Sequence, residues 1–176
     1  HLAAETAFRC RQEAAALFHV EDPEQVVFTF NATHGLNIAI RSLIKPGGRV
    51  LISGFEHNAV TRPLAALGAE IRTAAGPLFQ PDRFLEELDS ALVHWTPDAV
   101  ICTHVSNVFG YVLPMDQVAG RCGARGIPLI VDASQSAGTL PVDLQGWGAA
   151  FVAMPGHKGL FGPQGTGLLL CSGESQ

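Results

Sequence analysis

The stretch that decides the fold reads AVICTH (residues 99–104), followed by a helical pattern over residues 114–125 and then by PLIV (residues 128–131). The two flanking segments are short and mostly apolar, which is typical of strands buried on both faces of a sheet. A strand, a helix and a second strand in this order predict a parallel pair of strands joined by a helical crossover.

The same alternation continues in both directions from this unit. Further strands are predicted at residues 26–30, 49–53, 69–73, 151–154 and 167–171, and further helices at residues 2–18, 33–44, 58–67 and 81–92. We therefore expect an α/β domain with three layers, a mainly parallel sheet with helices on both faces. The last two strands are too close for a helical crossover, so one antiparallel strand is expected near the C-terminus. The glycine-rich link between them (residues 162–167) lacks the order of a nucleotide-binding loop and is interpreted as a hairpin turn.

Composition excludes several classes of function. With 176 residues, 47 % of them hydrophobic, the chain is expected to be a single folded domain. A net charge of −5 without a basic cluster argues against a nucleic-acid partner. No apolar run is long enough to span a membrane, and the four scattered cysteines lack metal-ligand or disulfide-framework spacing. We expect a soluble, cytoplasmic domain without a metal site.

Five clusters of polar residues follow predicted strands. Ligands of open parallel sheets bind beyond the carboxyl ends of the strands, so all five clusters are expected at one edge of the sheet. The clusters are residues 31–35, 56–58, 104–107, 132–135 and 156–158.

Each cluster also has a simpler, structural interpretation. Asn31 or Thr33 could be a helix cap, and Asp132 another cap. His57 could be a hydrogen-bonded structural histidine, Asn107 a turn residue before Gly110, and Lys158 a solvated lysine.

Taken together, however, the clusters suit one cofactor, pyridoxal 5'-phosphate. That cofactor needs a phosphate cradle, a lysine amine for the Schiff base, a carboxylate facing the pyridine nitrogen, a donor to the ring hydroxyl and a ring over its face. Of the two lysines, Lys45 lies in a Pro-Gly-Gly turn remote from this edge, which leaves Lys158.

Five motifs in this order resemble a known family. They are VFTFNAT (residues 27–33), EHNAV (residues 56–60), VSNVFG (residues 105–110), VDASQSAG (residues 131–138) and PGHK (residues 155–158). The sequence from about residue 25 to residue 170 resembles the class V aminotransferase group of pyridoxal-phosphate enzymes of fold type I, and within it the cysteine desulfurases and selenocysteine lyases. The resemblance implies the large domain of a pyridoxal-phosphate-dependent transferase.

The resemblance also implies roles for eight residues. Lys158 and His57 would be catalytic: Lys158 would carry the internal aldimine and move the α-proton of the substrate, and His57 would stack on the cofactor ring and assist. The cofactor-binding residues would be Asp132 at the pyridine nitrogen, Gln135 at the ring oxygen, Asn107 at the ring or the substrate carboxylate, and Ala32, Thr33 and His157 at the phosphate. Pro155 stands where the common desulfurase motif has a serine, so one phosphate contact is expected from elsewhere, such as a partner subunit.

The activity implied is the removal of sulfur from L-cysteine, or a similar small amino acid, to give alanine and a persulfide. A homodimer and a sulfur-acceptor protein are the implied partners. The motifs are equally compatible with another class V enzyme (a selenocysteine lyase, an aminotransferase or a kynureninase-like lyase) and with a truncated, inactive domain.

The extent of the chain bears on these alternatives. The chain begins at His1 inside a predicted helix, and the family's persulfide cysteine and substrate-carboxylate arginine belong to a C-terminal region that it does not contain. Cys171 ends a predicted strand and is not expected to be the nucleophile. We therefore expect residues 1–176 to be a single large domain, a fragment lacking an N-terminal segment and the C-terminal small domain.

Overall fold

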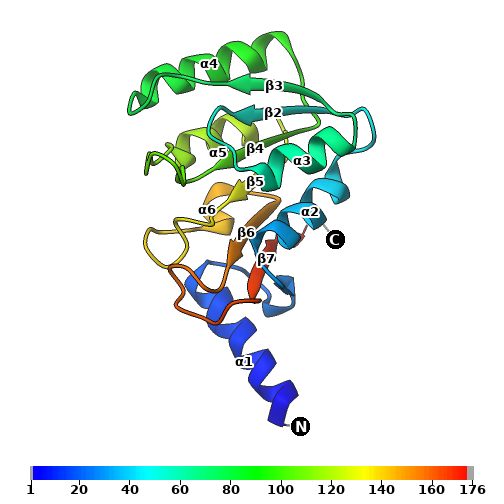
Figure 1. The fold of residues 1–176 in the computed structure, drawn as a ribbon, viewed down its shortest axis with the longest axis vertical. Coiled ribbons are helices and arrows are strands. Elements are labelled where there is room, and N and C mark those ends of the chain that lie inside the picture. Colours follow the sequence, from blue (N-terminus) through cyan, green and yellow to red (C-terminus); the bar gives the residue numbers. More distant parts are fainter. Residues whose placement is uncertain (1, 174–176) are drawn as a thin grey trace.

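The computed structural model describes residues 2–173, in which strands and helices alternate along most of the chain (Figure 1). The helices are α1 (Leu2–Leu17), α2 (Ala32–Leu43), α3 (Asn58–Ala66), α4 (Pro81–His94), α5 (Met115–Gly123) and α6 (Leu144–Trp147), with a short 3-10 helix at Pro23–Gln25. The strands are β1 (Val26–Thr29), β2 (Arg49–Ser53), β3 (Glu70–Ala74), β4 (Ala99–Thr103), β5 (Leu129–Asp132), β6 (Phe151–Pro155) and β7 (Gly167–Cys171).

The strands form one seven-stranded sheet in the order β1-β7-β6-β5-β4-β2-β3. β7 runs antiparallel to both of its neighbours, β1 and β6. The pairs β6–β5, β5–β4, β4–β2 and β2–β3 are all parallel. The prediction of a mainly parallel sheet with one antiparallel strand near the C-terminus is therefore confirmed.

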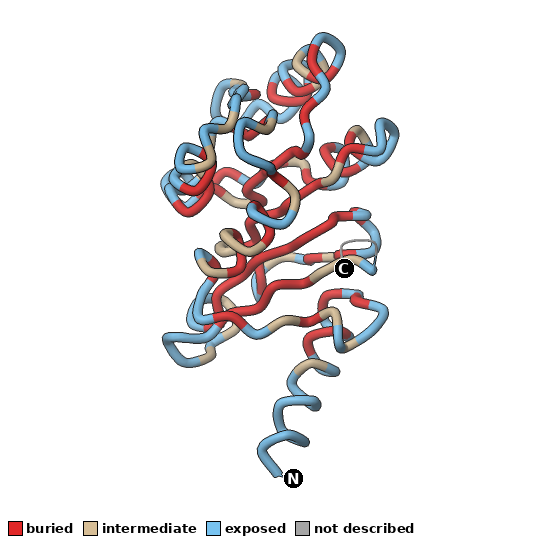
Figure 2. Tube along the Cα trace, turned by 90° about the vertical axis from the view of Figure 1, so that its right-hand side faces the viewer, coloured by how far each residue is buried: buried red, intermediate tan, exposed pale blue. Residues whose placement is uncertain are grey.

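Side chains of the central strands alternate between two hydrophobic cores, one on each face of the sheet. Leu129 and Val131 of β5 belong to the core covered by α1, α4, α5 and α6, whereas Ile130 belongs to the core covered by α2 and α3. This period of two, with both faces apolar, explains why the central strands are almost continuously hydrophobic in sequence. Burial of these strands under both layers is visible as the continuous red tube in Figure 2.

The sequence does not predict α6, because a helix of four residues is too short to show a hydrophobic period. Its ends are fixed locally instead. Asp143 caps it by accepting from Gly146 N at 2.8 Å, and Gly148 ends it with φ +56°. The short helix contributes Trp147 to the core under α5.

Helix α1 extends away from the sheet at one end of the molecule (Figures 1 and 2). Only its last turns are covered, with Ala14 and Ala15 buried, while Leu2, Phe8 and Leu17 are exposed. Apolar side chains left uncovered in this way are typical of a surface that packs against another element or chain.

Within residues 2–173 no helix is long and apolar enough to cross a membrane. The same described residues contain no group of three or more His, Cys, Asp or Glu side chains placed to hold a metal ion.

Candidate active site

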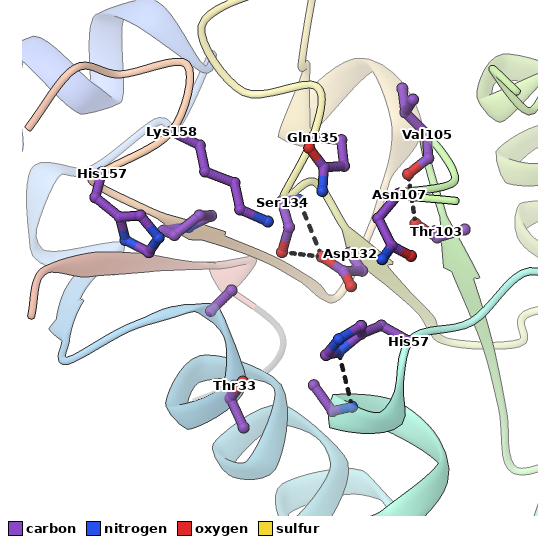
Figure 3. Close-up of a pocket in the computed structure, with 13 residues that line it drawn as sticks. Thr33, His57, Thr103, Val105, Asn107, Asp132, Ser134, Gln135, His157 and Lys158 are labelled. Carbon is purple, nitrogen blue, oxygen red and sulfur yellow. Dashed lines mark hydrogen bonds between the residues drawn. The ribbon is translucent and has the colours of Figure 1, made fainter. Parts of the chain in front are cut away.

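A pocket of about 160 Å³ lies at the edge of the sheet where the parallel strands end (Figure 3). All eight residues singled out from the sequence line it: Ala32, Thr33, His57, Asn107, Asp132, Gln135, His157 and Lys158. Five further lining residues are Ala59, Thr103, Val105, Ser134 and Pro155.

The sheet brings these residues together because they follow the carboxyl ends of adjacent strands. Thr103, Asp132 and Pro155 are the last residues of β4, β5 and β6, which are neighbouring parallel strands. Parallel strands end at the same edge, so residues far apart in sequence become neighbours there. The pocket is thus a direct consequence of the strand order.

Asp132 is buried, with 3 % of its surface exposed, and is held by Ser134. Its Oδ1 accepts two hydrogen bonds, from Ser134 N at 2.9 Å and from Ser134 Oγ at 2.5 Å. The bond to the backbone two residues ahead is a local turn of the kind that aspartate favours. The alternative of a helix cap is wrong, because no helix begins in the described stretch between Asp132 and Leu144, where α6 starts. Both bonds use Oδ1 and leave Oδ2 for a ligand in the pocket.

The protonation of Asp132 depends on what faces it. Burial raises the pKa of the carboxyl above its ordinary value, while the bonds from Ser134 and, to a smaller extent, the neighbouring His57 and Lys158 act in the opposite direction. A cationic group bound at Oδ2 would favour the carboxylate further. The site therefore suits a ligand that presents a protonated ring nitrogen.

His57 serves the fold and faces the pocket at the same time. Its Nδ1 caps α3 by accepting from Ala59 N at 3.1 Å. A nitrogen that accepts carries no proton, so the neutral ring has its hydrogen on Nε2. Figure 3 shows the ring between α3 and Asp132.

The N-terminus of α2 forms another wall of the pocket. Of the two candidate caps, the structure uses Asn31, whose Oδ1 accepts from His34 N at 2.8 Å. The N–H groups of Ala32 and Thr33 belong to the first turn, where no intrahelical acceptor exists. Such a helix N-terminus attracts an anion such as phosphate.

Lys158 lies in the loop between β6 and β7, and a close backbone contact fixes that loop. Gly138 has φ +83°, and a Cβ on it would lie 2.2 Å from the carbonyl oxygen of Gly159. A Cβ on Gly159 would in turn lie 2.2 Å from the carbonyl oxygen of Ala137. The loop after Asp132 and the loop carrying Lys158 are therefore in contact, and Figure 3 shows the lysine side chain reaching towards Ser134.

Asn107 and Gln135 line the pocket from the loops after β4 and β5. The turn before Gly110 is made by Ser106, whose carbonyl accepts from Gly110 N at 2.9 Å and whose Oγ accepts from Phe109 N at 3.4 Å. The turn therefore does not depend on the Asn107 side chain, whose amide lies near Asp132 in Figure 3.

Sequence reasoning placed Ser134 and Glu56 in the polar clusters after the strands but assigned no role to either. Ser134 could have been found from its place two residues after an aspartate, the spacing of a side-chain-to-backbone turn. Glu56 stands beside His57, but its contacts with Ser53 and Thr103 join strands that are 50 residues apart and leave no local pattern.

None of the four cysteines lines the pocket. Burial raises the pKa of Cys102 well above its ordinary value, that of Cys122 to about 12 and that of Cys171 to about 11. Cys10 is exposed on α1. Because a thiolate is the nucleophilic form, the three buried or half-buried cysteines are poor nucleophiles.

The family described as Aminotransferase class-V matches residues 1–176, and the chain belongs to that family. The resemblance found in the sequence is thereby confirmed.

Similar proteins carry a narrower description. The chain is 33 % identical over 172 residues to a probable cysteine desulfurase of Methanothermobacter thermautotrophicus, covering 94 % of this chain and 42 % of that protein. A solved apo cysteine desulfurase from Thermococcus onnurineus matches with a TM-score of 0.84 and 26 % identity, over 98 % of this chain and 44 % of that one. A solved structure of SspA in complex with cysteine matches with a TM-score of 0.81 and 25 % identity, over 97 % of this chain and 51 % of that one. The chain spans about two-fifths of the curated relatives it matches.

Proposed function

We propose that the chain is the cofactor-binding part of a pyridoxal-phosphate-dependent enzyme of the cysteine desulfurase type. The observation that carries the proposal is that Lys158, Asp132 and His57 line the same pocket as the N-terminus of α2. The similarity to named cysteine desulfurases supports the reaction type.

The residues present fit pyridoxal 5'-phosphate. Nζ of Lys158 would hold the cofactor covalently, and Oδ2 of Asp132 would accept from its ring nitrogen. Ala32, Thr33 and His157 would hold its phosphate at the N-terminus of α2. The buried Asp132, with only one oxygen used by Ser134, is the feature that best matches a cationic ring. When bound, the cofactor supplies an electron sink for the carbon next to the substrate's amino group.

The remaining steps fall to side chains of the chain itself. Lys158 would move the α-proton of the substrate through Nζ, and the ring of His57 would stack on the cofactor and assist that transfer. Gln135 would donate to the ring oxygen, and Asn107 would contact the ring or the substrate carboxylate. Because Asp132 is buried, little water would reach the pair that its carboxylate would form with the ring nitrogen, which would strengthen their attraction.

For the substrate we propose L-cysteine or a similar small amino acid, giving alanine and a persulfide. None of the cysteines of this chain lines the pocket, so the sulfur would be accepted by a thiol elsewhere in the complete enzyme, with a sulfur-acceptor protein as a further partner. Pro155, a buried lining residue, offers no hydroxyl to a phosphate, which supports a contribution from a second subunit in a homodimer. A cytoplasmic location completes the proposal.

The partial coverage of the relatives supports the proposed domain organisation. Residues 1–176 would form one large domain, and a small domain and an N-terminal segment would account for the rest of a protein as long as its relatives. The exposed apolar side chains of α1 are compatible with packing against such a part.

The experiment uses the complete natural protein that carries this sequence. Purified protein loaded with pyridoxal 5'-phosphate is incubated separately with L-cysteine, L-selenocysteine and L-kynurenine, and alanine is quantified. Alanine from L-cysteine, with sulfide released when added dithiothreitol reduces the persulfide, would support the proposal. Alanine from selenocysteine or kynurenine alone would replace desulfuration by one of those lyase activities, and amino-group exchange with a keto acid would indicate an aminotransferase.

A further inference from the structure

Glu56 joins the loop before α3 to two strands of the sheet. Its Oε1 accepts from Ser53 Oγ at 2.5 Å and from Thr103 N at 2.7 Å. Ser53 is the last residue of β2 and Thr103 is the last residue of β4. The Ser53 hydroxyl oxygen also accepts from Phe55 N at 3.2 Å, so three backbone segments meet at one carboxyl group.

The hydrogen bonds of Glu56 to Ser53 and Thr103, called the clamp below, lie just beyond the last paired residues of β2 and β4. The register of β2 and β4 runs from Val50 opposite Ala99 to Ile52 opposite Ile101 and goes no further. The N–H of Thr103 lies beyond that register, and the Glu56 carboxyl satisfies it. The carboxyl therefore replaces a missing ladder bond at the edge that carries the pocket.

The chemical state of this carboxyl follows from its surroundings. Its second oxygen, Oε2, is buried and makes no hydrogen bond to any described residue. Burial, with a smaller contribution from the neighbouring Asp132 charge, raises the pKa of Glu56 to about 8. The other titratable group beside it is the buried Cys102, whose own pKa is raised. A buried oxygen without a partner is far less costly on a neutral acid than on a carboxylate.

The residue that follows the clamp is His57. Glu56 fixes the backbone before it, and the bond from Ala59 N fixes its ring nitrogen Nδ1. Loss of the clamp would free the loop on one side while leaving the helix cap in place. The ring would then be anchored only through α3.

We propose that Glu56 is a positioning residue, held as a neutral acid, that clamps the His57 loop to β2 and β4 without placing a second negative charge beside Asp132. The inference rests on the proposed function, since His57 is positioned for the cofactor ring. It concerns the acceptor oxygen of Glu56 rather than its charge, and that distinction can be tested.

The test compares Glu56→Gln, which keeps an acceptor oxygen without a charge, with Glu56→Ala, which removes the acceptor. Infrared difference spectra of the cofactor-free complete protein at pH 6.5, well below about 8, would reveal the protonated carboxyl of the wild type as a band that Glu56→Gln lacks. The NMR signal of the His57 ring proton next to Nδ1, and the affinity for added pyridoxal 5'-phosphate, report the positioning. Glu56→Gln is expected to match the wild type in both, and Glu56→Ala to shift the signal and weaken the affinity about tenfold, for the loss of two hydrogen bonds.

Three results would overturn the proposal. The first two are absence of the protonated-carboxyl band and a Glu56→Gln variant as impaired as Glu56→Ala. The third is a Glu56→Ala variant that binds the cofactor like the wild type and leaves the His57 signal unshifted. If Glu56→Ala does not fold, Ser53→Ala removes one of the two donors and is expected to give a smaller shift in the same direction. A wild type that binds no cofactor refutes the proposed function instead, since the infrared and NMR readouts in unloaded protein still test Glu56.

Discussion

Replacing Gly138 by alanine should separate backbone strain from the contact that holds the Lys158 loop. Gly138 has φ +83°, and its added Cβ would lie 2.2 Å from the Gly159 carbonyl oxygen. Gly47 is a matched control, because it has φ +76° but nothing within 4 Å of the position its Cβ would take. Both variants incur the cost of a left-handed conformation, about 1 to 2 kcal/mol. Only Gly138→Ala must also move the neighbouring loop.

The size of that movement sets the expected effect. Side-chain Cβ atoms essentially never approach a neighbour closer than 3.0 Å, so the Gly159 carbonyl must retreat by about 0.8 Å (3.0 − 2.2). Overpacking of this kind costs about 1 to 3 kcal/mol, and a displacement near 1 Å at a reacting group lowers its efficiency by about 100-fold.

The assay is urea unfolding combined with titration of pyridoxal 5'-phosphate into the complete protein. Gly47→Ala should lose stability alone, whereas Gly138→Ala should lose more stability and also bind the cofactor at least tenfold more weakly. Equal cofactor binding by the two variants would show that the contact between Gly138 and Gly159 does not position Lys158.

Three further predictions follow from the pocket. Asp132→Asn keeps an acceptor for Ser134, so unfolding in urea should show little loss of stability. Cofactor affinity should fall about tenfold, because a charge-assisted bond to the ring nitrogen becomes a neutral one. Unchanged affinity would refute the pairing of Asp132 with the ring nitrogen. His57→Ala removes the cap at Ala59 N and should cost about 1 kcal/mol of stability together with weaker cofactor binding, and a loss of stability alone would leave His57 a purely structural residue. The pKa of Glu56 rises from 4.5 to about 8 on folding, so its protonation stabilises the folded state fully below pH 4.5 and this contribution is lost as the pH rises through 8. The rise of the pKa from 4.5 to about 8 corresponds to at most about 5 kcal/mol. Urea unfolding between pH 5 and pH 9 should show a decline in stability that Glu56→Gln removes, and identical pH profiles of the two proteins would contradict this prediction.

The sequence was sufficient to predict the alternation of strands and helices, the mainly parallel sheet and the edge at which the pocket lies. Segments such as residues 99–103 and 129–131 are buried on both faces of the sheet, which is why they are almost continuously apolar in sequence. The polar residues after the strands lie together because parallel strands end at one edge, a rule that needs no knowledge of tertiary contacts.

The parts that could not be predicted depend on contacts between distant segments. The clamp of Glu56 on Thr103 spans 47 residues, and the approach of Gly138 to Gly159 is seen only once two loops are folded together. The sequence does not decide whether Asn31 or Thr33 caps α2, because both side chains can accept from a first-turn N–H. Strand order, which decides such neighbours, is set by packing of the whole domain rather than by any one segment.

The central claim is that Lys158 holds pyridoxal 5'-phosphate opposite Asp132. The most direct measurement is borohydride reduction of the complete protein after incubation with the cofactor, followed by peptide mass spectrometry. We predict that the reduced cofactor is found on the peptide containing Lys158 and that Lys158→Ala abolishes both this label and the visible absorption of the bound cofactor. Labelling of Lys45 instead, or a Lys158→Ala protein that retains the absorption, would contradict the account.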